Sequence, residues 1–154
     1  MPGEIDWMYL MKTKTKKIIL DSNILIGMLH NDAKAIALIE TIRKSHAHPY
    51  VSIMTHIELD IGIVSERHKQ EARALLASFY CQELTMDIAK NVSKLLQPFA
   101  KDKQRKAQLL PDAIIAATAK HLNADICTAN IKDFRALSIQ DNQIIEYKTD
   151  KKQK

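Results

Sequence analysis

Short apolar runs that alternate with helix-forming segments are the feature of this sequence that most restricts its fold. The first run, Ile18-Ile19-Leu20, is continuous, as in a strand buried on both faces. Further strand-like runs occupy 49–54, 80–85, 125–128 and 143–147. The alternation predicts an α/β protein, a three-layer α/β/α sandwich with a mostly parallel central sheet.

Between these runs, apolar residues recur at helical spacing. The spacing predicts helices over 31–45, 55–64, 66–79, 88–99 and 109–122. We expect the last helix to carry Pro111 in its first turn, where the missing N–H does no harm, and to end at Asn123. We interpret the charged residues KDKQRK, 101–106, as the connector before it.

The length of 154 residues suits one domain. We place it at 17–147, after an N-terminal extension, 1–16, that we expect to be disordered, and before a basic tail, 148–154. The net charge of +5 comes from these two ends, because 18–147 holds equal numbers of acidic and basic residues. The charge alone therefore does not establish a nucleic-acid partner.

Composition excludes several classes of protein. No apolar stretch approaches the roughly 20 residues of a membrane-spanning helix. The three glycines form no glycine-rich phosphate loop. Cys81 and Cys127 lack metal-ligand spacing. We interpret them as buried free thiols of a cytoplasmic protein, with a disulfide as the alternative.

Four acidic side chains follow strands or begin helices in separate parts of the sequence. They are Asp21, directly after the first run; Glu58, four residues past the run that ends at Met54; Asp112, in the first turn expected for 109–122; and Asp133, five residues past 125–128. The carboxyl ends of parallel strands meet at one edge of a sheet. We therefore expect these carboxylates to converge.

Each acid also has a purely structural explanation. Thr55 and Glu58 match a helix capping box, Asp112 suits the positive end of a helix dipole, and Asp21 and Asp133 suit the start of a helix or turn. Crowded carboxylates, however, repel one another unless a cation neutralises them. A set of oxygen ligands without Cys or clear His ligands favours Mg²⁺ or Mn²⁺, ions that commonly drive phosphodiester cleavage.

Four segments carry a resemblance to a known family: ILDSNILI (19–26), SIMTHIEL (52–59), LLPDAIIAATA (109–119) and ICTANIKDF (126–134). In this order they resemble the PIN-domain ribonucleases, most closely the VapC-type toxins of toxin–antitoxin pairs. The resemblance implies a metal-dependent endoribonuclease. Matched position by position, it also implies that the metal-binding catalytic acids are Asp21, Glu58, Asp112 and Asp133.

The same matching implies supporting residues. Asn23 and Thr128 would orient carboxylates or waters, and Asn130 would either do the same or hold a tight turn. In the implied mechanism, water activated by Mg²⁺ attacks the phosphorus and the 3′ oxygen departs. The basic residues Lys103, Arg105 and Lys106 would border the cleft and hold RNA phosphates, although a solvated loop is the interpretation we favour for them.

By resemblance, the partners would be an RNA substrate, with transfer RNA expected first, a cognate antitoxin and a second copy of the chain in a homodimer. Binding of the antitoxin would neutralise a toxin that inhibits translation. A catalytically silent PIN-like module that binds RNA or protein is the alternative. A dehalogenase-type or response-regulator-type phosphotransfer domain would need a paired acid or D-x-D-x-T after the first strand, and DSNIL supplies neither.

Overall fold

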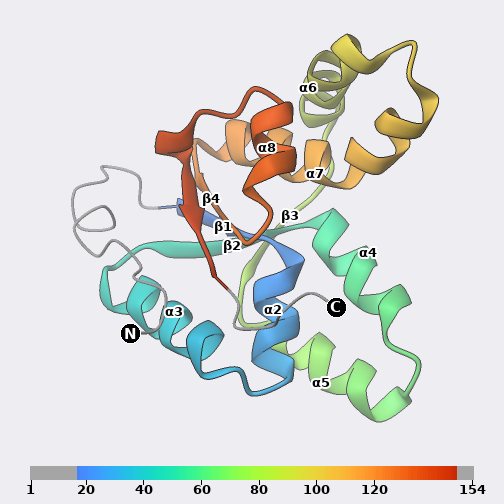
Figure 1. Cartoon of the computed structure of the whole chain (residues 1–154). Coiled ribbons are helices and arrows are strands. Elements are labelled where there is room, and N and C mark those ends of the chain that lie inside the picture. Colours follow the sequence, from blue (N-terminus) through green and yellow to red (C-terminus); the bar gives the residue numbers. More distant parts are fainter. Residues whose placement is uncertain (1–16, 149–154) are drawn as a thin grey trace.

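The computed structural model describes residues 17–148, which form a five-stranded sheet between two layers of helices (Figure 1). The strands are β1 (Lys17–Leu20), β2 (His48–Ser52), β3 (Tyr80–Gln82), β4 (Asp125–Thr128) and β5 (Ile144–Glu146). Their spatial order is β3-β2-β1-β4-β5, and every neighbouring pair is parallel. The predicted α/β/α sandwich is confirmed, and its sheet is wholly parallel across the described strands.

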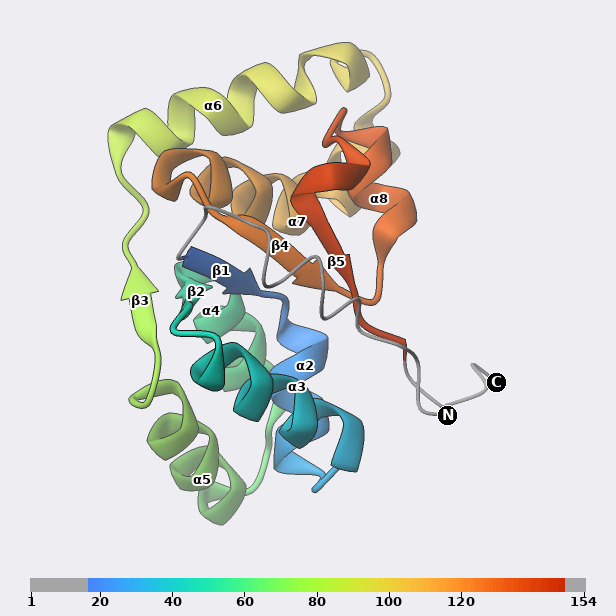
Figure 2. The ribbon, with the colours of Figure 1, turned by 90° about the vertical axis from the view of Figure 1, so that its left-hand side faces the viewer.

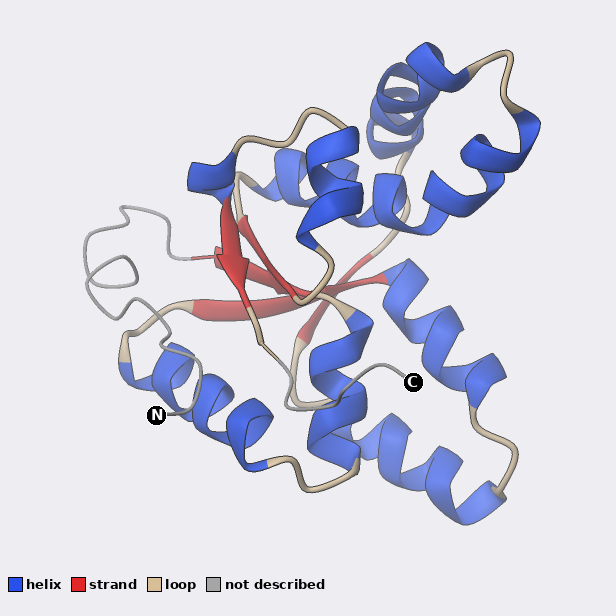
Figure 3. Ribbon diagram, viewed as in Figure 1, coloured by secondary structure: helices blue, strands red, loops and turns tan. Residues whose placement is uncertain are grey.

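Helices connect the strands and cover both faces of the sheet (Figure 3). They are α2 (Ser22–Leu29), α3 (Ala33–Lys44), α4 (Ile53–Gly62), α5 (Glu66–Leu76), α6 (Met86–Leu96), α7 (Lys103–Leu122) and α8 (Ile131–Ala136), with short 3-10 turns at Gln97–Phe99 and Asp141–Gln143. Figures 1 and 2 show α2, α3 and α5 on one side of the sheet and α6, α7 and α8 on the other.

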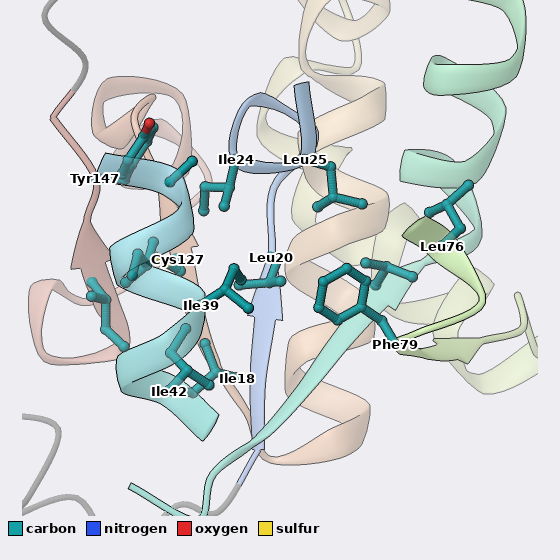
Figure 4. Close-up of a cluster of buried hydrophobic side chains, with 14 of the residues drawn as sticks. Ile18, Leu20, Ile24, Leu25, Ile39, Ile42, Leu76, Phe79, Cys127 and Tyr147 are labelled. Carbon is teal, nitrogen blue, oxygen red and sulfur yellow. The ribbon is translucent and has the colours of Figure 1, made fainter. Parts of the chain in front are cut away.

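The central strand β1 contributes to a separate hydrophobic core on each face. Ile18 and Leu20 point toward α2 and α3 and pack in the cluster drawn in Figure 4. Ile19 points to the opposite face and packs against α6, α7 and α8. This burial on both faces explains why the first run of the sequence is continuously apolar.

The register of the sheet places the ends of β1 and β4 side by side. Leu20 pairs with Cys127, and the backbone N–H of Asp21 continues the pairing by donating to the Cys127 carbonyl at 2.9 Å. Because β1 connects toward β2 on one side and β4 lies on its other side, the strand order reverses at β1. Functional side chains of open parallel sheets gather at this reversal, at the carboxyl ends of the strands.

Helix α4 begins earlier than the sequence predicted. Its first residue is Ile53, and the hydroxyl of Ser52 caps it by accepting the N–H of Thr55 at 3.3 Å. The capping box predicted for Thr55 and Glu58 is therefore wrong, because Thr55 already lies inside the helix. Capping does not explain Glu58, which lies in the second turn of α4.

Helix α7 is also longer than predicted. It begins at Lys103, capped by the Asp102 carboxylate, which accepts the Arg105 N–H at 3.0 Å. The connector predicted at 101–106 is therefore largely helical, and Pro111 and Asp112 lie in the interior of the helix instead of its first turn. The dipole explanation for Asp112 fails with this correction. Asn123 ends the helix in a left-handed conformation, as predicted.

Several smaller predictions have definite outcomes. Cys127 is buried and Cys81 is exposed, so one of the two thiols predicted to be buried is not; both are free. No helix in the described part of the chain is long and apolar enough to cross a membrane. The predictions for the N-terminal extension and for most of the C-terminal tail fall on 1–16 and 149–154, outside the described residues.

Candidate functional site

Asp21 is the centre of the candidate site. It caps α2, with one carboxylate oxygen accepting the Ser22 N–H at 2.7 Å, and its other oxygen accepts the Thr128 hydroxyl at 2.7 Å. The carboxyl group is buried, and this burial raises its pKa, whereas the hydrogen bonds from Thr128 and Ser22 act in the opposite direction. Capping and participation in the site therefore coincide at Asp21.

Glu58 reaches the same place from α4. The Ser22 hydroxyl lies 3.3 Å from an Asp21 oxygen and 3.5 Å from a Glu58 oxygen, so it bridges the two carboxylates. Partial burial and then the negative charge of Asp21 raise the pKa of Glu58. The sequence interpretation missed Ser22, although its position directly after Asp21 at the start of a helix was the available signal.

Asp112 enters the site from the middle of α7. Burial is the main cause that raises its pKa to about 7, and the charges of Asp21, Asp133 and Glu58 add to it. These electrostatic interactions mean that the four predicted acids share one region of the protein. The four carboxylates therefore lie near one another, as the sequence predicted.

Asn130 connects the remaining acids. Its side-chain amide donates to Asp112 at 3.2 Å and to Asp133 at 2.9 Å, and its backbone N–H donates to the Thr128 hydroxyl at 2.9 Å. The two roles weighed for Asn130, orienting carboxylates and holding a turn, are thus both present. Through Thr128 and Asn130, the segment after β4 contacts three of the four acids.

Asp133 differs from the other acids electrostatically. The Asn130 amide is the main cause that lowers its pKa, and Arg105 contributes through a hydrogen bond of 3.2 Å and its charge. Both side chains of this ion pair are mostly buried: the Arg105 side chain is 30% exposed and the Asp133 side chain 26%. Arg105, predicted to hold RNA phosphates, therefore lies at the edge of the acidic site.

Three other predicted site residues make no hydrogen bond or ion pair with the acids among residues 17–148. Asn23 is exposed on α2, and no hydrogen bond to an acid is present for it among residues 17–148. Lys103 is exposed and Lys106 half-buried on α7, without an ion pair to the four acids in the described part of the chain. Of the basic residues predicted for RNA, only Arg105 contacts the site.

The donor set fits a hard divalent cation by its chemistry. Asp21, Glu58 and Asp112 offer only carboxylate oxygens, which Mg²⁺ and Mn²⁺ prefer, and the charge of Asp21 raises the pKa of both others. A cation among them would relieve this repulsion. Within residues 17–148, however, no three His, Cys, Asp or Glu side chains lie close enough to share an ion in their present arrangement.

A cavity of about 510 Å³ adjoins the site on the Glu58 side. Its lining comes from α2, α4, the loop before α5 and α5 itself, and combines apolar side chains such as Ile26, Leu59 and Val64 with the polar side chains of His30, His68 and Glu71. Val64, which lines it, is 92% exposed. An apolar surface of this kind on one side of an acidic site is typical of a place where another protein binds.

Comparisons with known proteins agree with this architecture. The family model of the PIN domain matches residues 18–139, and no curated protein matches the sequence. Among solved structures, a toxin–antitoxin complex from Klebsiella pneumoniae is similar at a TM-score of 0.66 and 28% identity, covering 86% of this chain and 99% of that chain.

Two more distant structures share the fold. FitAcB from Neisseria gonorrhoeae matches at a TM-score of 0.61 and 20% identity, over 84% of this chain and 96% of that chain. VapBC2 from Rickettsia felis, bound to a DNA fragment from its promoter, matches at a TM-score of 0.66 and 18% identity. The match covers 84% of this chain and 97% of that chain. Because the family model covers most of the chain and the described fold agrees with these structures, the protein belongs to the PIN domain family.

Proposed function

We propose that the protein is a cytoplasmic, divalent-metal-dependent endoribonuclease and the toxin of a toxin–antitoxin pair. The observation that carries the proposal is the convergence of Asp21, Glu58 and Asp112 at the carboxyl end of the sheet, where the charge of Asp21 raises the pKa of the other two. Membership of the PIN domain family and the similarity to a toxin–antitoxin complex support it.

In this proposal Asp21, Glu58, Asp112 and Asp133 are the catalytic acids and hold Mg²⁺, with Mn²⁺ as a substitute. The ion, when bound, lowers the pKa of a water and offsets the charge of the scissile phosphate. Thr128 and Ser22 hold the Asp21 carboxylate through hydrogen bonds. Because the acids do not share an ion in their present arrangement, they would have to draw closer when metal binds.

The chain also offers a cation to the substrate. Arg105 lies beside Asp133 at the edge of the acids, where its guanidinium can pair with an RNA phosphate while the acids hold the metal. Lys103 and Lys106 lie on the same turns of α7 and would extend this positive edge. We propose RNA, with transfer RNA first, as the substrate, and inhibition of translation as the consequence of its cleavage.

We further propose that an antitoxin binds the apolar cavity beside Glu58. Val64, which lines the cavity, is exposed to solvent, and a partner that fills the cavity would also block access to Glu58. One similar solved structure is a toxin–antitoxin complex, and another, VapBC2, is bound to a DNA fragment from its promoter. We also propose that the chain forms a homodimer. The apolar faces of α3 and α5 are not evidence for a dimer interface, because their side chains pack in the core of the same chain.

The test is incubation of the purified full chain with total RNA, with Mg²⁺ and with a chelator, followed by mapping of the cut ends. Asp21→Asn should abolish cleavage and leave the fold intact. Asparagine has nearly the shape of aspartate, and burial already favours the uncharged form of Asp21 by raising its pKa. Asp141→Asn is the matched control, since Asp141 is exposed and pairs only with Arg135 among the described contacts.

Cleavage that needs Mg²⁺, is lost in Asp21→Asn and persists in Asp141→Asn supports the proposal. If Asp21→Asn cuts RNA at the wild-type rate, the proposed site is wrong. If no variant and no metal condition yields cleavage while the protein still binds RNA, the silent binding module is the better description.

A further inference from the structure

A group of aromatic and basic side chains lies on β1, β2 and β3, from the amino end of β1 to the level of Ile19, two residues before Asp21. We define the aromatic platform as Lys17, His48, Tyr50 and Tyr80. Lys17, His48 and Tyr80 are the first residues of β1, β2 and β3, and Tyr50 is the middle residue of β2. Lys17 pairs in register with His48, and Tyr50 with Tyr80, so the four side chains lie on neighbouring strands. Neither the proposed catalytic site nor its apolar cavity includes any of them.

The rings of the platform contact one another closely. Tyr50 stacks on Tyr80 with centroids 5.1 Å apart and planes inclined by 29°, and His48 meets Tyr80 edge-on at 5.9 Å. The Lys17 ammonium lies 5.7 Å from the centre of the Tyr50 ring. A stacked pair with a cation over it is the arrangement that proteins use to hold unpaired nucleobases and their phosphates.

Packing of the sheet does not require all of this aromatic surface. Cross-strand aromatic pairs do stabilise sheets, and half-buried Tyr50 packs against the core on its face. Tyr80, however, is 58% exposed and His48 is also exposed. Tyr80 begins β3, an edge strand of the sheet, and no described helix covers the outer side of β3 in Figure 2.

The charge around the platform favours a polyanion. Lys17 belongs to the platform and supplies a positive charge within it. Arg43 and Lys44, at the end of α3, and His46 lead into β2 at the same end of the sheet. Glu83, just past β3, is the acid nearest along the chain and raises the pKa of Cys81.

We propose that the aromatic platform binds unpaired nucleotides of the RNA substrate, with a base stacked on Tyr80 and phosphates beside Lys17 and His48. The inference rests on the proposed RNA substrate and adds a second contact region to it. The four residue-to-residue steps from Lys17 to Asp21 span about 13 Å at the rise of a strand. One RNA molecule can therefore contact the platform and the acids together.

The test measures RNA affinity with chelator present, so that binding is separated from cleavage. Labelled oligoadenylate and a blunt RNA duplex of equal length are titrated with the full chain, with Tyr80→Ala and with Tyr80→Trp. Leu84→Ala is the matched control, because it also truncates an exposed apolar side chain next to β3. Circular dichroism confirms that each variant is folded.

Tyr80→Ala should weaken oligoadenylate binding about tenfold, within the range for loss of one stacked base. Tyr80→Trp should retain the affinity, and the duplex, whose bases are already paired, should respond to neither change. Equal oligoadenylate affinities of wild type and Tyr80→Ala would overturn the inference. So would sedimentation showing that Tyr80→Ala converts a dimer to a monomer without changing RNA affinity, because the face would then join two copies.

These outcomes are separate from the test of the proposed nuclease. Mg²⁺-dependent cleavage with Tyr80-independent binding overturns the platform and leaves the nuclease in place. If RNA binding depends on Tyr80 but no metal condition yields cleavage, the nuclease proposal is overturned and the platform remains.

Discussion

At the scale of single residues, the hydroxyl of Thr128 joins the acids to the sheet. It donates to Asp21 at 2.7 Å and accepts the Asn130 N–H at 2.9 Å, and it is fully buried. We predict that Thr128→Val, which keeps the shape and removes both hydrogen bonds, lowers Mg²⁺ affinity or activity about 10- to 100-fold. Titration of cleavage rate against Mg²⁺ measures this.

The matched control for that change is Thr118→Val. Thr118 is also buried, but its hydroxyl donates to the Ile114 carbonyl inside α7, away from the carboxylates. Both variants should lose similar stability, and only Thr128→Val should lose activity. Equal losses of activity in the two variants would show that Thr128 acts through the fold alone.

The raised pKa of Asp112 predicts how the free energy of unfolding depends on pH. Its pKa rises from 3.8 to about 7 on folding, so between these values the folded protein keeps a proton that the unfolded chain has released. The free energy of unfolding of the metal-free protein should therefore fall as the pH rises through this window. Asp112→Asn should reduce the fall and add on the order of 1–2 kcal/mol of stability at about pH 8.

Urea unfolding at about pH 5 and about pH 8, with and without Mg²⁺, measures this effect. Mg²⁺ should stabilise the wild type at the higher pH more than it stabilises Asp112→Asn. Asp133→Asn provides a control of opposite sign, because folding lowers the pKa of Asp133 and its charged form adds stability at neutral pH. An unchanged pH profile in Asp112→Asn would contradict the prediction.

At the scale of elements, α7 carries a proline at an unfavourable place. Pro111 lies in the helix interior, where it has no N–H to donate to the Ala107 carbonyl and its ring crowds that carbonyl. We predict that Pro111→Ala increases the free energy of unfolding by about 1–3 kcal/mol. It should also lower the cleavage rate, because relaxing the helix moves the neighbouring Asp112 relative to Asp21.

Urea unfolding and cleavage assays of the same preparation measure both parts. Gln108→Ala, an exposed substitution on the same helix, is the control for surface changes in α7. If Pro111→Ala leaves the unfolding free energy unchanged, the helix tolerates the proline without cost and the proposed strain is absent.

The elements that the sequence predicted well are those with a strong apolar pattern. The buried runs at β1 and β4 appear as strands, and Asn123 ends α7 as its position suggested. The first two turns of α7 were missed because KDKQRK has the composition of a loop and Pro111 resembled a helix start. The Asp102 cap, which begins the helix, has no apolar pattern beside it to reveal it.

The site was predicted in its acids and less well in its supporting contacts. The ends of strands and the family resemblance together indicated all four carboxylates. The bridge from Ser22 to Glu58 depends on the packing of α2 against α4, and the ion pair of Arg105 depends on the packing of α7 against α8. Contacts between distant segments of this kind are set by tertiary packing, which local sequence patterns do not encode.

At the scale of the whole molecule, the two ends of the sheet differ in charge and chemistry. The carboxyl end gathers the four acids, of which Asp21 is buried; partial burial and then the charge of Asp21 raise the pKa of Glu58 and Asp112. The aromatic platform begins at the amino end with Lys17 and His48 and extends to Tyr50 and Tyr80, and Lys17 lies over Tyr50. In the proposed complex, the acids act on a phosphate of the RNA backbone and the platform stacks its unpaired bases. The two regions therefore favour the same class of ligand, single-stranded RNA.

The two hydrophobic cores share β1, and this predicts that the described residues unfold as one unit. Ile18 packs toward α2 and α3, Ile19 toward α6, α7 and α8, and each is no more than 1% exposed. Ile18→Val and Ile19→Val should each cost about 0.5–1.5 kcal/mol with an unchanged urea m value. Circular dichroism and methyl NMR signals from both faces should report a single transition. If Ile19→Val instead melts the α6–α8 face first while the other face keeps its wild-type midpoint, the cores are independent and the single domain expected at 17–147 would have to be divided.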